Sequence, residues 1–179
     1  GKELSRMLID TLGVPQYFYY DDISDEYFLV TKQALQEDVN NGIEQLSCHL
    51  VAGNGDEKWT TKYTLKGNLV NVVLTNSNYF IFVNASDFSN GADFKFDGKN
   101  ETSAFGIYIN HDGSIKGYHK FDSDGGLVLS SAMKVNSNIL SLVGRSNPQN
   151  KNEPVFLLVS PDGEIVFKNK EEIRNSFNP

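Results

Sequence analysis

The sequence predicts an all-β fold made of four-stranded antiparallel meander repeats. Three stretches predict it, because each joins two apolar runs through a short corner that contains glycine: Glu44–Thr64 around Asn54-Gly55, Ser103–Phe121 around Asp112-Gly113, and Pro154–Asn169 around Asp162-Gly163. A tight hairpin needs positive φ at its corner, which Asn, Asp and Gly tolerate. The corner glycines lie 58 and 50 residues apart (113 − 55 and 163 − 113). A spacing near 50 indicates one unit with variable loops.

The middle hairpin has the clearest strand pattern. Phe105, Ile107 and Ile109 share one parity before the corner at Asp112-Gly113, and Ile115 resumes an apolar parity after it. An apolar period of two is typical of a half-buried strand. The middle stretch is therefore predicted to be a β-hairpin.

Further apolar runs precede each hairpin and complete the unit. They are Glu26–Thr31, Asn78–Ala85 and Asn138–Gly144, with Asn68–Thr75 and Gly126–Met133 before the last two. Each unit then has four short strands, and four-stranded meanders repeated along a chain are typical of β-propeller blades. We expect three such repeats, covering about residues 16–64, 65–122 and 123–170.

The two ends of the chain carry helical patterns. Leu4, Met7, Leu8 and Leu12 have helical spacing, which predicts an N-terminal helix within residues 1–15. Residues 171–179 are expected to be a tail or a short helix. Ala34–Leu46 is ambiguous, because its apolar residues fit one helical face while Asn40-Asn41-Gly42 interrupts a helix. We favour a loop there, with a strand from Ile43.

Composition excludes several classes of partner. The chain of 179 residues has a net charge of −7 and no Lys/Arg cluster, so a nucleic-acid partner is not expected. No apolar run has the length of a membrane-spanning segment. Cys48 is the only cysteine, which excludes an internal disulfide. Its place inside an apolar run favours a buried core role over that of a nucleophile. Gly1 is not a natural start of a protein chain. As the location of the protein, bacterial export or surface attachment is favoured over the cytoplasm.

Two groups of residues are candidate sites. An aromatic–acidic cluster surrounds an expected turn: Tyr17–Tyr20 with Asp21, Asp22, Asp25 and Glu26. Its carboxylates could bind a cation or do acid–base work, or the segment could be a solvated turn between two strands. Within it, the candidate ligand-binding residues are Tyr19, Tyr20, Asp21 and Asp22. Asp122 and Asp124 resemble the start of an acidic calcium loop that lacks the distal Glu, so they are the candidate metal ligands. No cofactor is predicted.

Several other residues have a structural interpretation. His49, His111 and His119 have no partner at ligand spacing and are expected to be satisfied strand or surface histidines. Trp59 is expected to be a packing anchor. The triplets that begin at Asn84 and Asn100 match glycosylation acceptors, but such triplets arise by chance in Asn-rich chains.

The repeats resemble those of quinoprotein-like bacterial β-propellers. That outline is a corner followed by an aromatic residue and a lysine, as in Asn54-Gly55 with Trp59 and Lys62, Asp112-Gly113 with Tyr118 and Lys120, and Asp162-Gly163 with Phe167 and Lys168. The resemblance covers about residues 20 to 170 and implies a propeller fold without carrying over a cofactor site. Two of the three aromatic positions depart from Trp.

A second resemblance is to bacterial WG repeats. Phe88–Ala92 followed by Phe105–Ile109 and Asp112-Gly113 is similar to one such repeat, whereas the other two units lack the pattern. We therefore rank this resemblance second.

The expected function is a non-catalytic binding or scaffold module that presents loops to a protein or glycan partner. One alternative is a carboxylate-dependent hydrolase or lyase acting on glycans, for which Asp21, Asp22, Asp122 and Asp124 are the candidates. Another is a structural repeat protein that self-associates. Three units fall short of the usual four to eight blades, so we expect a missing remainder of a longer chain, with self-association as the alternative.

Overall fold

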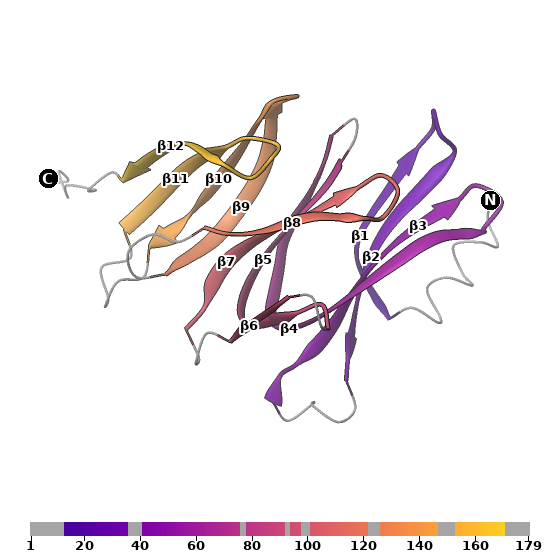
Figure 1. Cartoon of the computed structure of the whole chain (residues 1–179), viewed down its shortest axis with the longest axis horizontal. Helices are drawn as coiled ribbons and strands as arrows, with labels where there is room; N and C mark the ends of the chain where they lie inside the picture. The colour runs from indigo at the N-terminus through magenta and orange to yellow at the C-terminus, as the bar shows by residue number, and fades with distance from the viewer. Residues whose placement is uncertain are drawn as a thin grey trace, which may run out of the picture. The chain divides into compact units, whose positions relative to one another are not determined.

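The computed structural model describes residues 13–35, 41–75, 78–91, 94–97, 101–121, 126–146 and 153–170. These ranges form β-strands and turns, with no α-helix among them (Figure 1). Neighbouring strands whose register is defined run antiparallel. The predicted all-β class with antiparallel meanders is therefore confirmed. Across the described ranges the structure has no helix with the length and apolarity that a bilayer crossing requires.

The first sheet has eight strands in the order β1-β2-β3-β4-β5-β7-β8, with β6 paired to β5. Apart from the side branch β6, each strand pairs with the one that follows it in this order, as in a meander. The bounds are β1 Val14–Asp21, β2 Glu26–Ala34, β3 Glu44–Ala52, β4 Glu57–Leu74, β5 Asn78–Ser89, β6 Lys95–Asp97, β7 Ser103–Asn110 and β8 Ile115–Lys120.

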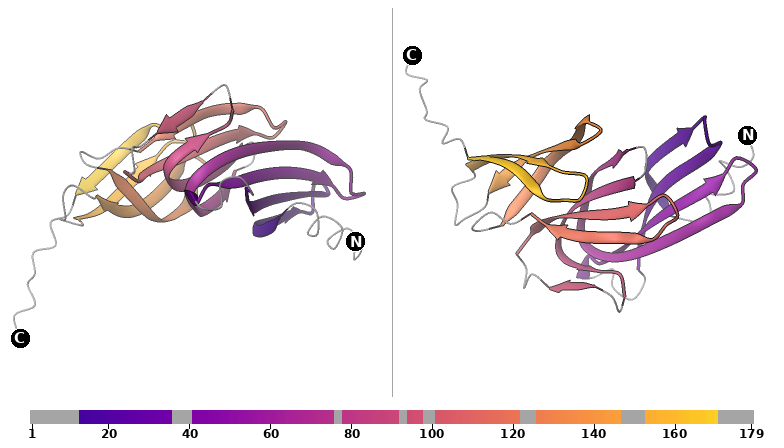
Figure 2. Two further views of the ribbon diagram at one scale, coloured as in Figure 1. Left: turned by 90° about the horizontal axis from the view of Figure 1, so that it is seen from below. Right: turned by 45° about the horizontal axis from the view of Figure 1, so that its top comes forward.

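The second sheet is a four-stranded meander in the order β12-β11-β10-β9. Its bounds are β9 Leu127–Asn136, β10 Ile139–Ser146, β11 Glu153–Val159 and β12 Ile165–Lys170. Figure 2 shows these strands side by side from two directions. This sheet corresponds to the third predicted repeat.

The chain divides into two units. The first contains Gly1–Asn68, Ala85–Asn100 and Asp112–Ser114, and the second contains Leu69–Asn84, Glu101–His111 and Ile115–Pro179. Each unit has buried apolar side chains of its own. In the first they include Phe28, Val30, Leu46, Cys48, Leu50, Tyr63 and Phe88. In the second they form a cluster that includes Phe80, Phe82, Tyr108, Phe121, Leu140, Leu142 and Leu157.

The three predicted hairpins are present, and glycine lies at each corner. Gly55, Gly113 and Gly163 have φ of 95°, 86° and 84°. The flanking strands pair in the expected way, β3 with β4, β7 with β8, and β11 with β12. Because left-handed backbone costs little only for glycine, local sequence was sufficient to locate these corners.

The predicted division between the first two repeats differs from the structure. β4 continues without a break through the expected boundary at residues 64 and 65, so these repeats belong to one hydrogen-bonded sheet rather than to separate blades. An alternating apolar pattern defines strands but cannot show where one strand should end and another begin.

The chain ends and part of the ambiguous segment fall outside the described residues. The predicted N-terminal helix and the tail at 171–179 lie there, although Val14 and Pro15 already belong to β1. Of Ala34–Leu46, residues 36–40 are also outside. The strand expected from Ile43 is present as β3, which begins at Glu44.

Candidate functional site

Three aromatic side chains form a stack on β1 and β2, which we call the aromatic edge: Phe18, Tyr20 and Tyr27. Phe18 and Tyr20 lie two residues apart, so they share one face of β1, and Tyr20 is paired directly with Tyr27. The rings of Tyr20 and Tyr27 are stacked, with centroids 4.7 Å apart and an interplanar angle of 28°. Phe18 lies 5.7 Å from Tyr27 at 34°. Tyr27 therefore contacts both other rings, stacked on Tyr20 and tilted relative to Phe18.

A carboxylate is fixed at one end of this stack. The Tyr20 hydroxyl donates a hydrogen bond to Asp25 Oδ1 at 3.0 Å. Asp25 has a φ of 53°, and its carbonyl oxygen accepts a 2.7 Å bond from the Gly53 amide. A Cβ atom at Gly53 would overlap the Asp25 carboxylate. The hydrogen bond to Asp25, followed by burial, raises the pKa of Tyr20, so the hydroxyl stays protonated.

The structure separates the four residues predicted as a ligand site. Tyr20 belongs to the aromatic edge, whereas Tyr19 projects from the opposite face of β1. Asp21 Oδ1 accepts a hydrogen bond from the Ile23 amide, and Asp22 lies exposed in the following turn. The turn expected within this cluster is present at residues 22–25, between β1 and β2, and Tyr19, Tyr20 and Asp21 are the last residues of β1 before it.

Phe18 and Asp25 belong to the predicted aromatic–acidic cluster but were not among its four candidate ligand-binding residues. A period-two reading of residues 17–20 could have grouped Phe18 with Tyr20. No local pattern could have placed Asp25 beneath the Tyr20 hydroxyl, because that contact depends on the left-handed backbone of a non-glycine residue.

The metal prediction at Asp122 and Asp124 lies outside the described residues. Among the residues that the structure does describe, no group of three or more His, Cys, Asp or Glu side chains could hold a metal ion.

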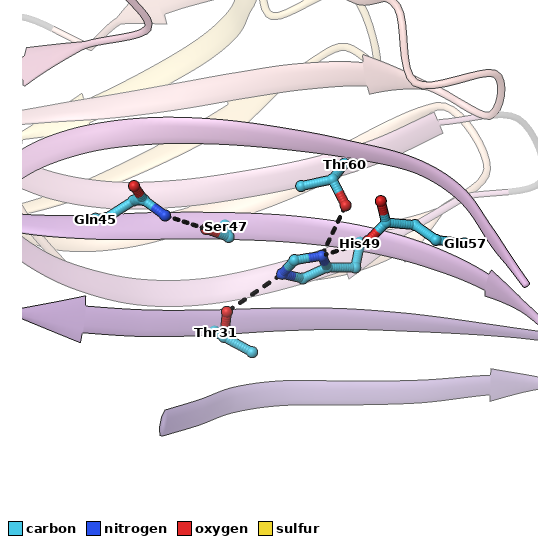
Figure 3. Close-up of polar contacts among 6 residues, drawn as sticks. All are labelled: Thr31, Gln45, Ser47, His49, Glu57 and Thr60. Carbon is cyan, nitrogen blue, oxygen red and sulfur yellow. Dashed lines mark hydrogen bonds and ion pairs between the residues drawn. The ribbon is translucent and has the colours of Figure 1, made fainter. Parts of the chain in front are cut away.

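A buried histidine forms a polar centre in the first unit (Figure 3). His49 Nδ1 lies 2.8 Å from Thr60 Oγ1 and 3.4 Å from Glu57 Oε2, while Nε2 lies 3.3 Å from Thr31 Oγ1. These partners lie on β2 and β4, on either side of β3. His49 is 1% exposed and Thr31 is fully buried.

Burial is the main reason why the pKa of His49 is lowered, with the Glu57 carboxylate acting in the opposite direction. A hydroxyl, an imidazole and a carboxylate in series could relay a proton. No substrate can reach the Thr31 hydroxyl, however, because its side chain is fully buried. His49 is therefore a satisfied strand histidine, as predicted.

The β9–β12 sheet has a second apolar side, which we call the exposed apolar face: Met133, Val143, Phe156 and Phe167. Val143 is paired with Phe156, and Phe167 is paired with Leu158, two residues further along β11. Met133 is paired with Ser141, which lies two residues before Val143 on β10. Residues two apart or directly paired share a face, so these side chains lie on one side of the sheet.

The side chains of the exposed apolar face are accessible to solvent: 55% for Met133, 41% for Val143, 39% for Phe156 and 47% for Phe167. Phe156 and Phe167 contact each other edge to face at 6.4 Å. The other side of β10 and β11 is buried, as shown by Leu142 and Leu157 at 0% and 2% exposure. This sheet is apolar on both faces.

Comparisons with known proteins find similarity only among solved structures. No family model and no curated protein matches the sequence. Two similar structures are a mutant of the apocarotenoid oxygenase (ACO) of Synechocystis and an ACO/RPE65 chimera, with TM-scores of 0.45 and 0.44 and identities of 10% and 14%. They align with 88% and 81% of this chain, which spans 38% and 34% of their lengths. The likeness concerns the fold alone.

Both neighbours are named after enzymes, so the comparison gives no support to the predicted non-catalytic binding or scaffold module. The predicted all-β class is shown by the strands of the structure itself.

Proposed function

We propose that the chain functions in association with another protein surface, and that a second copy of the chain covers the exposed apolar face. The observation that carries this proposal is the two-sided apolar character of the β9–β12 sheet. An antiparallel sheet with one solvated face normally alternates apolar and polar residues along each strand. Here Val143 and Phe156 are exposed on one side while Leu142 and Leu157 are buried on the other.

Exposed apolar side chains on a sheet face favour a protein partner over solvent. Single exposed apolar residues are common, but contiguous patches on soluble monomers are rarely larger than a few hundred Å² and usually mark interaction sites. The exposed apolar face extends over all four strands of its sheet. Covering it would remove these side chains from water, and burial of apolar surface contributes about 25 cal/mol of favourable free energy per Å².

Charge at the two ends of the sheet makes a second copy a suitable occupant. Arg145 is exposed and is paired with Pro154 at one end of β11. Glu164 is exposed beside Ile165, which is paired with Val159 at the other end of β11. Two copies stacked with antiparallel strands would bring Arg145 of each toward the Glu164 end of the other. A two-fold arrangement repeats this complementarity twice.

Analytical ultracentrifugation of the intact chain, from low to high micromolar concentration, tests the proposal. We expect a reversible dimer whose population rises with the concentration of the chain. The variants Val143→Lys and Phe156→Lys should remain monomeric. Ile23→Lys is the matched control, because Ile23 is an apolar residue that is 94% exposed in a turn of the other unit. This variant should dimerise as the unmodified chain does.

The binding of a dye that fluoresces on apolar surfaces distinguishes the remaining outcomes. A chain that stays monomeric and does not bind the dye would show that the face is covered within one molecule. A chain that stays monomeric and binds the dye would show that a second copy does not occupy an available face. Either result overturns the proposal. Far-UV circular dichroism of the two lysine variants establishes that they are folded.

A further inference from the structure

We propose that the aromatic edge is a binding site for a neutral saccharide, with a sugar ring stacked on Tyr20 and Phe18 and its hydroxyls bound by the carboxylates of Asp22 and Asp25. The site lies in the first unit and does not depend on the proposed association. It uses contacts that are distinct from those of the exposed apolar face.

The stack of rings is open on one side. Tyr27 packs against Tyr20 from β2, but β1 is the last strand of its sheet among the described residues, so no described strand lies beyond Tyr20. Phe18 and Tyr20 are accordingly 59% and 43% exposed. A flat apolar surface that lies outside β1 could therefore continue the stack by contacting these two rings.

The polar groups beside the rings are positioned in advance. Asp25 is held in a left-handed conformation that is unfavourable for a residue with a side chain, and Gly53 leaves space for its carboxylate. Tyr20 fixes one carboxylate oxygen. Asp22 lies exposed in the same turn as Asp25. Ionised carboxylates only accept hydrogen bonds, so a ligand with several hydroxyl donors suits them.

The ring geometry selects among ligands that bind aromatic side chains. A cage for an organic cation surrounds the charge with rings at large angles, whereas the angles here are 28° and 34°. The exposed rings of Phe18 and Tyr20 offer open apolar ring surface instead. A nucleotide could also stack there, but its phosphates would be repelled by Asp22, Asp25 and a net charge of −7. A neutral sugar has an apolar ring face and hydroxyl donors without charge.

Saturation-transfer NMR on the intact chain can measure this binding. The probes are neutral oligosaccharides of glucose, xylose, mannose and N-acetylglucosamine, with oligogalacturonate as the anionic probe and choline as the cationic one. We expect at least one neutral oligosaccharide to bind and the anionic probe to give no signal. Tyr20→Ala and Phe18→Ala should each weaken binding by about tenfold, because each removes one stacked ring.

Tyr19→Ala is the matched control, because Tyr19 is 41% exposed on the same strand but on its opposite face. This variant should bind as the unmodified chain does. Tyr20→Phe keeps the ring and should retain most of the affinity. Absence of binding by every neutral probe, binding of choline alone, or an equal loss in the Tyr19 variant would each overturn the proposal. Thermal melts establish that the variants are folded.

Discussion

Gly113 lies against the indole ring of Trp59, so closely that a Cβ atom at residue 113 would be 2.5 Å from the indole Cγ. Gly163 has the same relationship with His119, where a Cβ atom would lie 2.5 Å from the imidazole. In both pairs a corner glycine rests on an aromatic ring from the return strand of the preceding hairpin. The repeated corners thus have equivalent environments as well as equivalent backbone angles.

Gly113→Ala is expected to lower the free energy of unfolding by about 2–4 kcal/mol. The φ of 86° costs an alanine about 1–2 kcal/mol, and overlap with Trp59 adds a similar amount. Gly91→Ala is the matched control, because Gly91 has a φ of 89° with nothing within 4 Å of the added Cβ. Urea unfolding measures both variants. An equal loss in the two would show that contact with the ring has no effect.

Asn84 is expected to be a strong determinant of stability rather than a glycosylation site. Its side chain is 3% exposed and makes two 2.8 Å hydrogen bonds, one to the Leu129 carbonyl oxygen and one from the Leu129 amide. Asn84→Ala leaves both backbone groups unpaired and should cost about 2–4 kcal/mol. The exposed Asn136, which accepts one bond from the Asn138 amide, is the control. Asn136→Ala should cost less than about 1 kcal/mol. Urea unfolding compares them, and similar losses would contradict the prediction.

His49 should make stability fall as the solution becomes acidic. Its pKa is lowered in the folded state, so the unfolded chain binds the proton more readily. The contribution of neutral His49 is complete above the ordinary pKa of about 6.5 and is lost as pH falls below that value. His49→Gln should flatten the dependence of unfolding free energy on pH between about 7.5 and 5.5. An unchanged slope would contradict this assignment, whatever the absolute loss of stability.

Two tyrosines of the second unit are expected to respond oppositely to loss of their hydroxyl. The Tyr108 hydroxyl is buried with no hydrogen-bond partner among the described residues, and burial raises its pKa. Tyr108→Phe should therefore leave stability unchanged or raise it by up to about 1 kcal/mol. Tyr79→Phe should lower it by about 1 kcal/mol, because the Tyr79 hydroxyl lies 2.9 Å from His111 Nδ1. Thermal unfolding measures the pair, and a larger loss in the Tyr108 variant would contradict the prediction.

Much of the local structure could be predicted from the sequence because its causes are local. The corners at Gly55, Gly113 and Gly163 depend on backbone freedom that glycine supplies wherever it occurs. The period-two apolar pattern predicted the strands on either side. The core role of Cys48, which is fully buried, followed from its position within an apolar strand.

The candidate site was predicted only in part, because a ligand site depends on which faces of a strand its side chains share. Tyr19 and Tyr20 are neighbours in sequence but project to opposite sides of β1. Phe18 and Asp25 join Tyr20 through strand alternation and a left-handed turn residue. Composition alone grouped the aromatic and acidic residues without this selection.

By itself, the sequence determined the all-β class, the meander connections and the hairpin corners, since these follow from residue type and short-range alternation. Only the tertiary structure decided that β4 continues through the expected repeat boundary and that Asn84 is buried as a hydrogen-bonding partner of Leu129. It also decided that Phe156 is exposed. An apolar residue on a strand has the same local pattern whether its face is buried or exposed, because the covering surface comes from distant segments or from another molecule.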